Sequence, residues 1–248
     1  MNDVIIVTGA SRGIGAATAL LAAQRGYSVC VNYRANQSAA ESVVREIQSA
    51  GGRAIAVAAD VSREPDVVRL FETCDRDLGS PTALVNNAGI LEKQMRVEAV
   101  DAARIQRIFA TNVIGSFLCA REAVRRMSTK RGGAGGAIVN VSSAASRLGA
   151  PGEYVDYAAS KGAVDTLTVG LAKEVAGEGI RVNGVRAGYI YTDMHASGGE
   201  PGRVDRVKQF LPMRRGGTAN EVARAILWFL SSEASFTTGS FIEVTGGN

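Results

Sequence analysis

The sequence predicts an α/β protein built on a doubly wound parallel sheet of about seven strands, with helices on both faces. Short runs of apolar, β-branched residues alternate with helical patterns along the 248 residues, which is the order expected of βαβ units. The first run, Val4–Val7, is apolar at every position, as in a strand buried on both faces. A glycine-rich segment follows it directly, and glycine makes up 29 residues of the chain.

The other elements follow in the same alternation. Strands are expected at Val4–Val7, Ser28–Tyr33, Arg53–Ala59, Ala83–Asn86, Ala137–Val141, Arg181–Val185 and Phe241–Val244. These are short, mostly apolar runs, and Gly132–Gly136 is a flexible connector before the fifth. A chain of this length fits one domain. No repeat or low-complexity linker divides it, so we expect a single domain over residues 1–248.

Helices are expected where apolar residues recur at helical spacing between start and stop signals. The first two, Ile14–Arg25 and Ser38–Ala50, each end at a glycine. Ser62 is expected to cap the third helix, which has Pro65 in its first turn and closes at Gly79. The remaining helices are expected as two between Val97 and Met127, one at Tyr154–Val175, and one opened by the capping box Thr218–Glu221 and ending near Leu230.

Composition excludes several chemistries. The chain has one histidine, His195, and three cysteines, Cys30, Cys74 and Cys119, which are not spaced like metal ligands. A zinc site of the usual histidine or cysteine–histidine kind cannot be assembled from them, so no metal site is expected. A Ser-His-Asp triad would have to use His195. Acid–base catalysis is therefore expected to work without histidine.

Charge and apolar runs bear on partners and location. The net charge is +4 and the basic residues are mostly spread out, which argues against nucleic acid as a partner. No apolar run reaches the roughly 20 residues of a membrane helix, so no membrane association is expected. The first residues lack the basic segment that opens a signal peptide. Together with the odd, scattered set of cysteines, this favours a cytoplasmic protein.

The segment between the first strand and the first helix carries glycines in the spacing G-x-x-x-G-x-G, at Gly9, Gly13 and Gly15. Glycines let the backbone approach a pyrophosphate, and a helix N-terminus offers free N–H groups and a positive dipole end. The segment is interpreted as a phosphate-binding loop. The alternative is a glycine-rich turn that only packs the helix on the sheet.

This loop and four further motifs resemble the short-chain dehydrogenase/reductase family, whose fold is Rossmann-type. In the family's order, the further motifs are Asn86-Asn87-Ala88-Gly89, the helix residue Asn112, Ser142-Ser143 at a strand end, and Tyr157-x-x-x-Lys161. The resemblance spans Val4 to Gly247. The chain is similar to 3-oxoacyl-carrier-protein reductases and to bacterial glucose 1-dehydrogenase-like members. The resemblance implies an oxidoreductase that acts on a CH–OH group with a nicotinamide cofactor.

Tyr157 and Lys161 lie four residues apart on one expected helix, on the same face and about 6 Å apart along the axis. The ordinary pKa of tyrosine, about 10, is too high for a base near neutral pH. A fixed ammonium nearby favours phenolate and lowers that pKa. By the resemblance, Tyr157 exchanges a proton with the substrate oxygen, and Lys161 lowers the tyrosine pKa and binds the nicotinamide ribose. Ser143, with Ser142 as the fallback, holds the substrate oxygen, and Asn112 positions a water relay to Lys161.

The cofactor is expected to be NADP(H), with NAD(H) as the less favoured alternative. NAD-specific members usually end the second strand with an acid that binds the ribose 2′-hydroxyl, but here Tyr33 takes that place and Arg34 follows. Arg34 and Arg12 suit a 2′-phosphate, which guanidinium groups bind in a bidentate manner. The expected cofactor-binding set is Gly9, Ser11, Arg12, Gly13, Ile14, Gly15, Tyr33, Arg34, Asp60, Val61, Asn87, Ala88, Gly89, Tyr157, Lys161, Gly188, Ile190 and Thr192.

One departure from the family stands beside the expected nicotinamide site. Ala187 replaces the usual proline before Gly188, and we expect a looser turn because proline would fix φ. The irregular segment beyond it, at about 189–216, is expected to be a substrate lid. Its basic residues, Arg203, Arg206, Lys208, Arg214 and Arg215, are interpreted as a solvated face that could also attract an anion. Substrate contacts are expected from Ser143, Arg147, Tyr154, Tyr157, Tyr189 and His195, although a lone loop histidine is more often exposed.

The substrate is expected to be a small carbonyl or alcohol, and two classes stay open. One is a 3-oxoacyl thioester, for which the basic helix around Arg125–Arg131 would dock an acidic carrier protein. The other is a free sugar, polyol or small ketone. A non-catalytic NADP(H)-binding redox sensor is the alternative function, and the intact catalytic set argues against it. The family usually forms homotetramers through two long central helices and the C-terminal strand region, so a homotetramer is expected.

Overall fold

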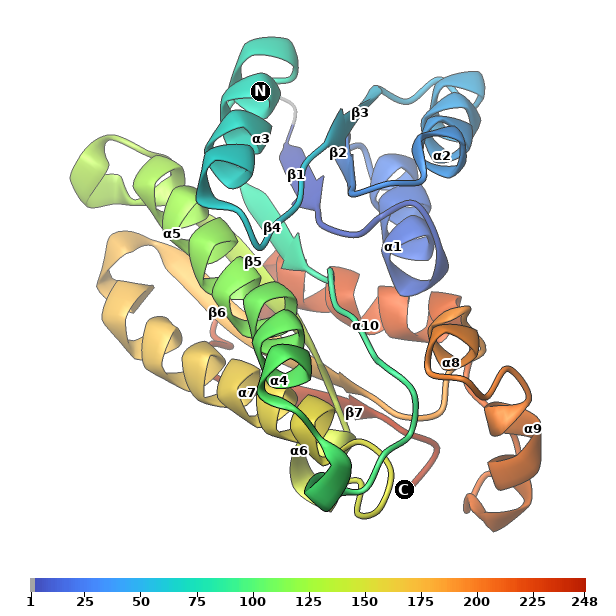
Figure 1. Cartoon of the computed structure of the whole chain (residues 1–248). Helices are drawn as coiled ribbons and strands as arrows, with labels where there is room; N and C mark the ends of the chain where they lie inside the picture. The colour runs from blue at the N-terminus through green and yellow to red at the C-terminus, as the bar shows by residue number, and fades with distance from the viewer. Residues whose placement is uncertain (1–2) are drawn as a thin grey trace.

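The computed structural model describes residues 3–248 and has a parallel seven-stranded sheet at its centre (Figure 1). The strand order is β3-β2-β1-β4-β5-β6-β7, which confirms the predicted doubly wound sheet. All seven strands fall where the sequence predicts them, within two residues at each end. The strands are β1 Val4–Val7, β2 Ser28–Tyr33, β3 Ala54–Ala58, β4 Ala83–Asn86, β5 Gly136–Ser143, β6 Ile180–Ala187 and β7 Phe241–Val244.

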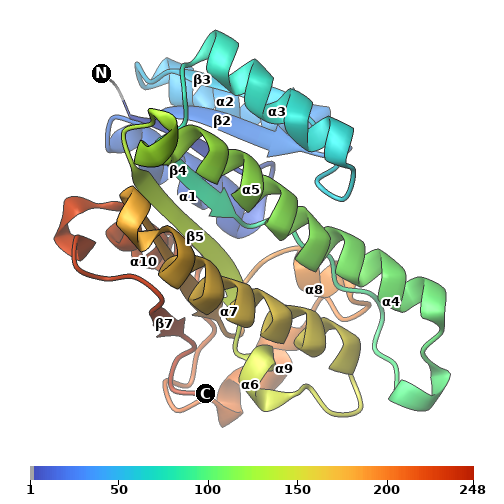
Figure 2. The ribbon, with the colours of Figure 1, turned by 90° about the vertical axis from the view of Figure 1, so that its left-hand side faces the viewer.

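Helices cover both faces of the sheet. One face carries α1 (Gly13–Gln24), α2 (Gln37–Ser49) and α10 (Ala219–Leu230), and the other carries α3 (Glu64–Asp77), α5 (Gly115–Met127) and α7 (Val155–Val175) (Figures 1 and 2). Alternate residues of β1 serve the two cores, because side chains of a strand alternate between its faces. Ile5 and Val7 join the first core, and Val4 and Ile6 join the second.

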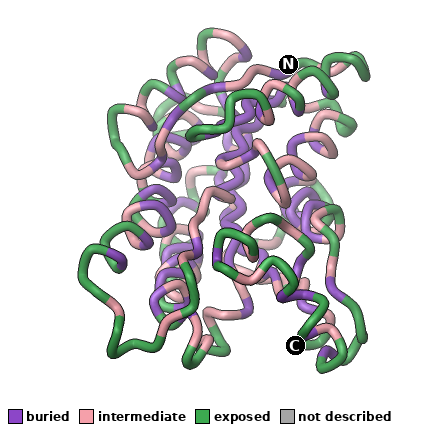
Figure 3. Tube along the Cα trace, turned by 45° about the vertical axis from the view of Figure 1, so that its right-hand side comes forward, coloured by how far each residue is buried: buried purple, intermediate pink, exposed green. Residues whose placement is uncertain are grey.

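Burial follows this layering. The strands form a buried centre, while the exposed residues lie on the outer helix faces and in the connections (Figure 3). The strand order reverses between β1 and β4, so the connections that leave these two strands diverge. Such a switch point opens a crevice at the carboxyl ends of the strands, which is where open α/β sheets bind ligands.

Two predicted helix features are corrected by the structure. Ser62 does not cap α3: its hydroxyl donates to Asp60 Oδ1 over 2.7 Å, and the cap residue is Arg63, which makes no side-chain capping bond. A serine two residues after an aspartate instead closes an Asx-type turn. The stretch predicted as two helices is one continuous helical run, in which α4 (Ala102–Phe109) joins α5 through a π turn at Ala110–Ile114.

The segment after β6 contains short helices that the sequence pattern did not show. These are α8 (Met194–Ser197) and α9 (Arg203–Val207). A further one-turn helix, α6 (Ala145–Leu148), lies after β5. Within residues 3–248, no helix has the length and apolar character needed to cross a membrane. The same residues contain no group of three or more histidine, cysteine, aspartate or glutamate side chains able to hold a metal ion.

Candidate active site

The glycine loop between β1 and α1 depends on its glycines. Gly9 and Gly13 adopt φ values of +61° and +56°, in the left-handed region that favours glycine. At Gly15 a Cβ would lie 2.5 Å from Asn87 Nδ2, so a side chain is excluded there by packing. Asn87 Nδ2 also donates to the carbonyls of Thr8 and Gly9, at 2.9 and 3.1 Å. The residue after β4 thus fixes the loop after β1.

A cavity of about 580 Å³ opens in front of this loop. The carboxyl ends of β1, β2 and β4 and the N-terminus of α1 surround it, and no side chain among the described residues caps that N-terminus. Free N–H groups at the start of a helix suit an anion such as a pyrophosphate. From the predicted cofactor set, the cavity lining includes Gly9, Ser11, Arg12, Gly13, Ile14, Tyr33, Arg34, Asp60, Val61, Asn87, Ala88, Gly89 and Thr192.

Two arginines at this cavity have no acidic partner. Arg12 and Arg34 are exposed, and within residues 3–248 neither guanidinium is hydrogen-bonded or ion-paired. Asp60, expected near the adenine, is partly engaged: its Oδ1 accepts from the backbone N–H and the hydroxyl of Ser62, at 3.0 and 2.7 Å. The cavity therefore carries free positive charge beside the end of β2.

A second cavity of about 360 Å³ adjoins the first and shares Ile14, Asn87, Leu91, Thr192 and Met194 with it. Ser143, Tyr157 and Lys161 line it, together with Gly188 and Ile190 of the predicted cofactor set. The two adjoining cavities thus run from the glycine loop to Tyr157. Gly15 is the one member of that set outside both linings, since it packs against Asn87.

The two serines at the end of β5 differ in direction. Ser143 lines the second cavity with Tyr157 and lies close enough to lower the tyrosine pKa, and its Oγ accepts from the N–H of Ala145 at 3.1 Å. Ser142 is buried, and its hydroxyl donates to the carbonyl of Lys161 at 3.4 Å. The geometry therefore favours Ser143 over Ser142 as the serine beside the tyrosine hydroxyl.

The electrostatics of Tyr157 and Lys161 differ from the expectation. Burial raises the pKa of Tyr157 to about 12, and the neighbouring Ser143 lowers that pKa in part. Burial also lowers the pKa of Lys161 to about 8, although the negative charge of Asp165 raises it in part. Lys161 Nζ lies 5.7 Å from the Tyr157 ring centre and donates to the carbonyl of Val141 at 2.7 Å. Loss of hydration thus outweighs the attraction by the ammonium that was expected to lower the tyrosine pKa.

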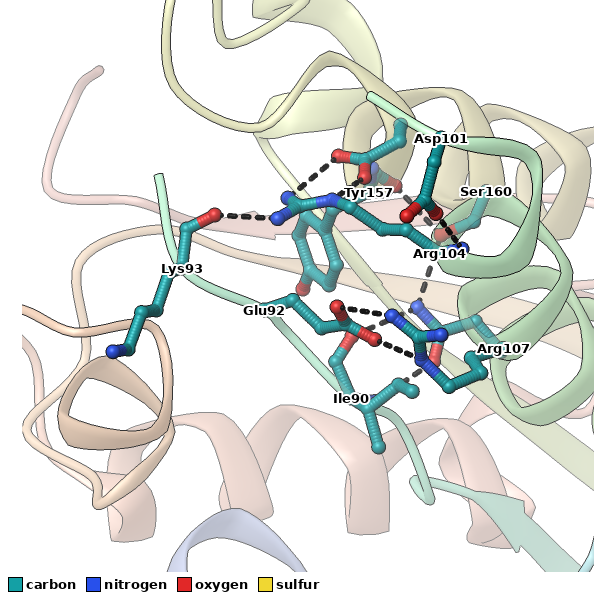
Figure 4. A network of polar contacts seen from close by, with 10 residues as sticks. Ile90, Glu92, Lys93, Asp101, Arg104, Arg107, Tyr157 and Ser160 are labelled. Atoms are coloured by element: carbon teal, nitrogen blue, oxygen red, sulfur yellow. Dashed lines mark hydrogen bonds and ion pairs between the residues drawn. The ribbon is translucent and has the colours of Figure 1, made fainter. Parts of the chain in front are cut away.

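Asn112 lies in the π turn, which brings its side chain toward the loop after β4. Its Oδ1 accepts from the N–H of Ile90 at 2.8 Å, and its Nδ2 donates to the carbonyl of Ile90 and the hydroxyl of Ser160 at 3.1 and 3.0 Å. Figure 4 shows Ile90 and Ser160 within this network. The Asn112 amide thus joins the loop after β4 to α7, the helix that carries Tyr157 and Lys161.

Three of the further predicted substrate contacts line the second cavity, and one does not. Tyr154, Tyr189 and His195 are in its lining, whereas Arg147 is outside it and pairs with Glu243 at 2.7 Å. His195 is half-buried rather than freely exposed: its Nε2 lies 3.0 Å from the carbonyl of Ile190, and burial lowers its pKa. The turn at Ala187 is held by a hydrogen bond from Gly188 N–H to the carbonyl of Val244 at 2.9 Å.

The interpretation of Arg203 as part of a solvated face is wrong. Its side chain is 7% exposed and lies between Glu153 and Glu200, with Nη1 2.9 Å from Glu200 Oε2 and Nη2 bonded to Glu153. The guanidinium also covers the rings of Tyr154 and Tyr189. Sequence reasoning did not pair Glu153 with Arg203, because 50 residues separate the two.

Comparisons with known proteins identify relatives that cover nearly the whole chain. A family model described as enoyl-(acyl carrier protein) reductase matches residues 9–248. An uncharacterized oxidoreductase of Escherichia coli, YgfF, is 64% identical over 98% of this chain and 99% of its own. A 3-oxoacyl-[acyl-carrier-protein] reductase of Synechocystis is 40% identical over 99% of this chain and 96% of its own.

The fold also matches a solved structure of a dehydrogenase/reductase. The crystal structure of a dehydrogenase/reductase from Sinorhizobium meliloti superposes with a TM-score of 0.91 at 31% identity, covering 99% of this chain and 94% of that one. The chain belongs to the short-chain dehydrogenase/reductase family. It is therefore an oxidoreductase of that family, and membership implies a nicotinamide cofactor.

Proposed function

We propose that the protein is an NADP(H)-dependent oxidoreductase that interconverts a carbonyl compound and a secondary alcohol. The observation that carries this proposal is the grouping of Ser143, Tyr157 and Lys161 in one cavity that adjoins the glycine-loop cavity. When bound there, the nicotinamide supplies the hydride to the carbonyl carbon or accepts it in the reverse direction. The chain's own groups supply the proton and hold the substrate oxygen.

In the reductive direction, Tyr157 donates its phenolic proton to the substrate oxygen as the C–H bond forms, so that hydride and proton add across the C=O bond. The raised pKa keeps this tyrosine protonated, which is the form that a proton donor needs. Ser143 donates a hydrogen bond to the same oxygen. Lys161 is placed to bind the nicotinamide ribose. Asn112 holds the loop between β4 and α4, here called the roof loop, and supports the supply of protons to Lys161.

The preference for NADP(H) is supported by Arg12 and Arg34. Both are exposed at the cavity, and both lack an acidic partner among residues 3–248. A 2′-phosphate would supply that partner. The backbone around Gly9 and Gly13 and the N-terminus of α1 would bind the pyrophosphate, with Asp60 at the adenine edge and Thr192 at the carboxamide.

The substrate cavity favours small, uncharged carbonyl compounds. Its lining is largely apolar, including Leu91, Leu148 and Pro151, and its one arginine, Arg203, is already paired with two carboxylates. Residues 189–216 form the lid of this cavity. Relatives named 3-oxoacyl-carrier-protein reductases keep an acyl thioester in the panel of candidate substrates.

Docking of an acidic carrier protein on the basic helix receives less support. Arg121, Arg125 and Arg126 all pair with Glu122, and Arg121 and Arg126 have second partners in Glu64 and Asp75. These pairs neutralise much of the charge that an acidic partner would recognise.

A homo-oligomer through the long helices is part of the proposal. Ile105, Ile114 and Phe117, on α4, the π turn and α5, are 42%, 50% and 51% exposed, and Val155 at the start of α7 is 38% exposed. These helices lie side by side on one face of the molecule (Figure 2). Light scattering that gives the mass of a single chain would contradict this part.

The test of the main proposal is Tyr157→Phe with a panel of ketones, sugars and 3-oxoacyl thioesters and both cofactors. Loss of a positioned proton donor is expected to lower turnover about 10²-fold or more, with NADPH binding measured by fluorescence unchanged. Turnover above a tenth of wild type in Tyr157→Phe would show that another group supplies the proton. Binding of NADPH with no turnover of any panel compound would favour the redox sensor.

A further inference from the structure

We propose that the buried ion pair of Arg104 and Asp156 positions Tyr157, and that it controls the rate of the proton-transfer step rather than the binding of substrate. This inference rests on the proposed role of Tyr157 as proton donor. Arg104 and Asp156 belong to none of the sequence motifs of the site, and both lie outside the linings of the two cavities.

The pair is buried and closely joined. Arg104 Nε lies 2.5 Å from Asp156 Oδ2, its Nη2 lies 3.4 Å from Oδ1, and the side chains are 4% and 6% exposed. Asp156 precedes Tyr157 in the chain, and its Oδ1 also accepts the backbone N–H of Tyr157 at 2.9 Å. Figure 4 shows the Arg104 guanidinium bonded to the Lys93 carbonyl within this network.

Tyr157 occupies a weak part of its helix. α7 begins at Val155, and the residue before it, Tyr154, makes no side-chain capping bond. The first N–H groups of a helix have no intrahelical acceptor, and helix ends fray. Asp156 supplies the missing acceptor for Tyr157, and Arg104 fixes the carboxylate of Asp156 from a different helix, α4.

Arg104 also reaches the roof of the site. Its Nη1 donates to the carbonyl of Lys93 at 2.6 Å, in the loop between β4 and α4. That loop bonds to the segment before α7 through Met95 N–H and the carbonyl of Glu153 at 2.9 Å. The Arg104 guanidinium thus connects three segments: α4, the roof loop and the first turn of α7, which holds Tyr157.

Stability alone is a poor reason for such a pair. Hydrophobic replacement of a buried ion pair is often neutral or stabilising, because two charges must otherwise lose their hydration. A catalytic group displaced by about 1 Å can lose on the order of 10²-fold in rate. The pair is therefore best explained by the placement of Tyr157.

The experiment compares Arg104→Lys and Asp156→Asn in the full-length protein with the carbonyl substrate identified by the panel. Lysine keeps the charge but cannot contact Asp156 twice and Lys93 once. Asparagine keeps the acceptor for Tyr157 N–H but loses the ion pair. We expect kcat to fall 10- to 100-fold in Arg104→Lys and less in Asp156→Asn. The KM of the carbonyl and the Kd of NADPH should stay within threefold of wild type.

The matched control is Arg126→Met, which breaks the pair with Asp75 between α5 and α3, away from both cavities. It should lower the Tm while kcat stays within twofold of wild type. Arg104→Lys is also made in the Tyr157→Phe background, where a residue that acts only through the tyrosine hydroxyl should cause no further loss. Residues that act as a unit are non-additive in this way.

The kcat values of these variants decide whether the ion pair positions Tyr157. An unchanged kcat in both single variants, or an equal loss from Arg104→Lys with and without Tyr157, overturns the positioning role. If Arg104→Lys does not fold, Asp156→Asn and the double variant Arg104→Met/Asp156→Asn, which leaves no unpaired charge, decide the question by the same kcat criterion. High activity of Tyr157→Phe alone would instead remove the proposed proton donor, so the two failures are distinguishable.

Discussion

The two cavities hold their arginines in opposite states. At the glycine-loop cavity, Arg12 and Arg34 are exposed and, within the described part of the chain, unpaired. At the substrate cavity, Arg203 is nearly buried between Glu153 and Glu200. An unpaired exposed cation is available to an incoming anion, whereas a paired buried cation joins parts of the protein. Position in the fold, rather than residue type, thus separates arginines that are available to a ligand from those that join parts of the protein.

The largest effect that tests this contrast is expected from the double variant Arg12→Ala/Arg34→Ala. Charge-assisted hydrogen bonds are worth about 1.5–3 kcal/mol each, so the loss of two should lower kcat/KM for NADPH by about 100-fold or more. The value for NADH should stay within threefold, because NADH lacks the 2′-phosphate. Equal losses with both cofactors would mean that these arginines do not distinguish them, and a wild-type preference for NADH would overturn the NADP(H) assignment.

The second test removes the paired arginine. Arg203→Met leaves Glu153 and Glu200 with the exposed Arg206 as their shared cation, and breaking a buried pair destabilises by up to about 3–5 kcal/mol. We expect a lower Tm and a KM for the carbonyl raised about tenfold, with NADPH binding unchanged. Arg206→Met is the matched control, since Arg206 pairs with the same Glu200 but is 54% exposed. If both variants behave alike, burial of Arg203 has no special role.

A third test uses pH and the buried Lys161. Its pKa in the folded protein is about 8, below the 10.4 of an exposed lysine. Between these values the unfolded chain holds a proton that the folded chain has lost, so stability from this group rises with pH. The Tm of wild type relative to Lys161→Met should therefore increase from pH 7.5 to 10 in cofactor-free protein. A flat difference would show that the ammonium is stabilised by groups other than those identified.

The smallest effect is expected from Lys208→Ala. Lys208 pairs with Asp205 on the surface, with exposed fractions of 44% and 63%, and exposed pairs of this kind contribute little. Tm, kcat and KM should all match wild type within error. A clear rise in KM would extend the functional part of the lid beyond Arg203.

Local signals predicted much of this molecule. The seven strands could be located because each is a short, mostly apolar run, and the glycine loop because its spaced glycines follow the first strand directly. Tyr157 and Lys161 share a cavity because four residues along a helix return to the same face.

Contacts between distant segments could not be predicted in the same way. Arg203 and Glu153 are 50 residues apart, and Arg104 and Asp156 are 52 apart, so no local pattern pairs them. Arg203 was therefore interpreted as solvated by its residue type alone. The raised pKa of Tyr157 was missed for a related reason: the helix spacing shows the nearby ammonium, but not how completely the ring is buried.

The π turn at Ala110–Ile114 makes chain length critical at one place in the helices. Deleting a single residue there would restore regular α-helical spacing, because a π turn holds one residue more than an α turn. Asn112 would then lose its hydrogen bonds with Ile90 and Ser160, while α5 would keep the same side toward the sheet. One-residue deletions in related chains should therefore be absent from residues 110–114.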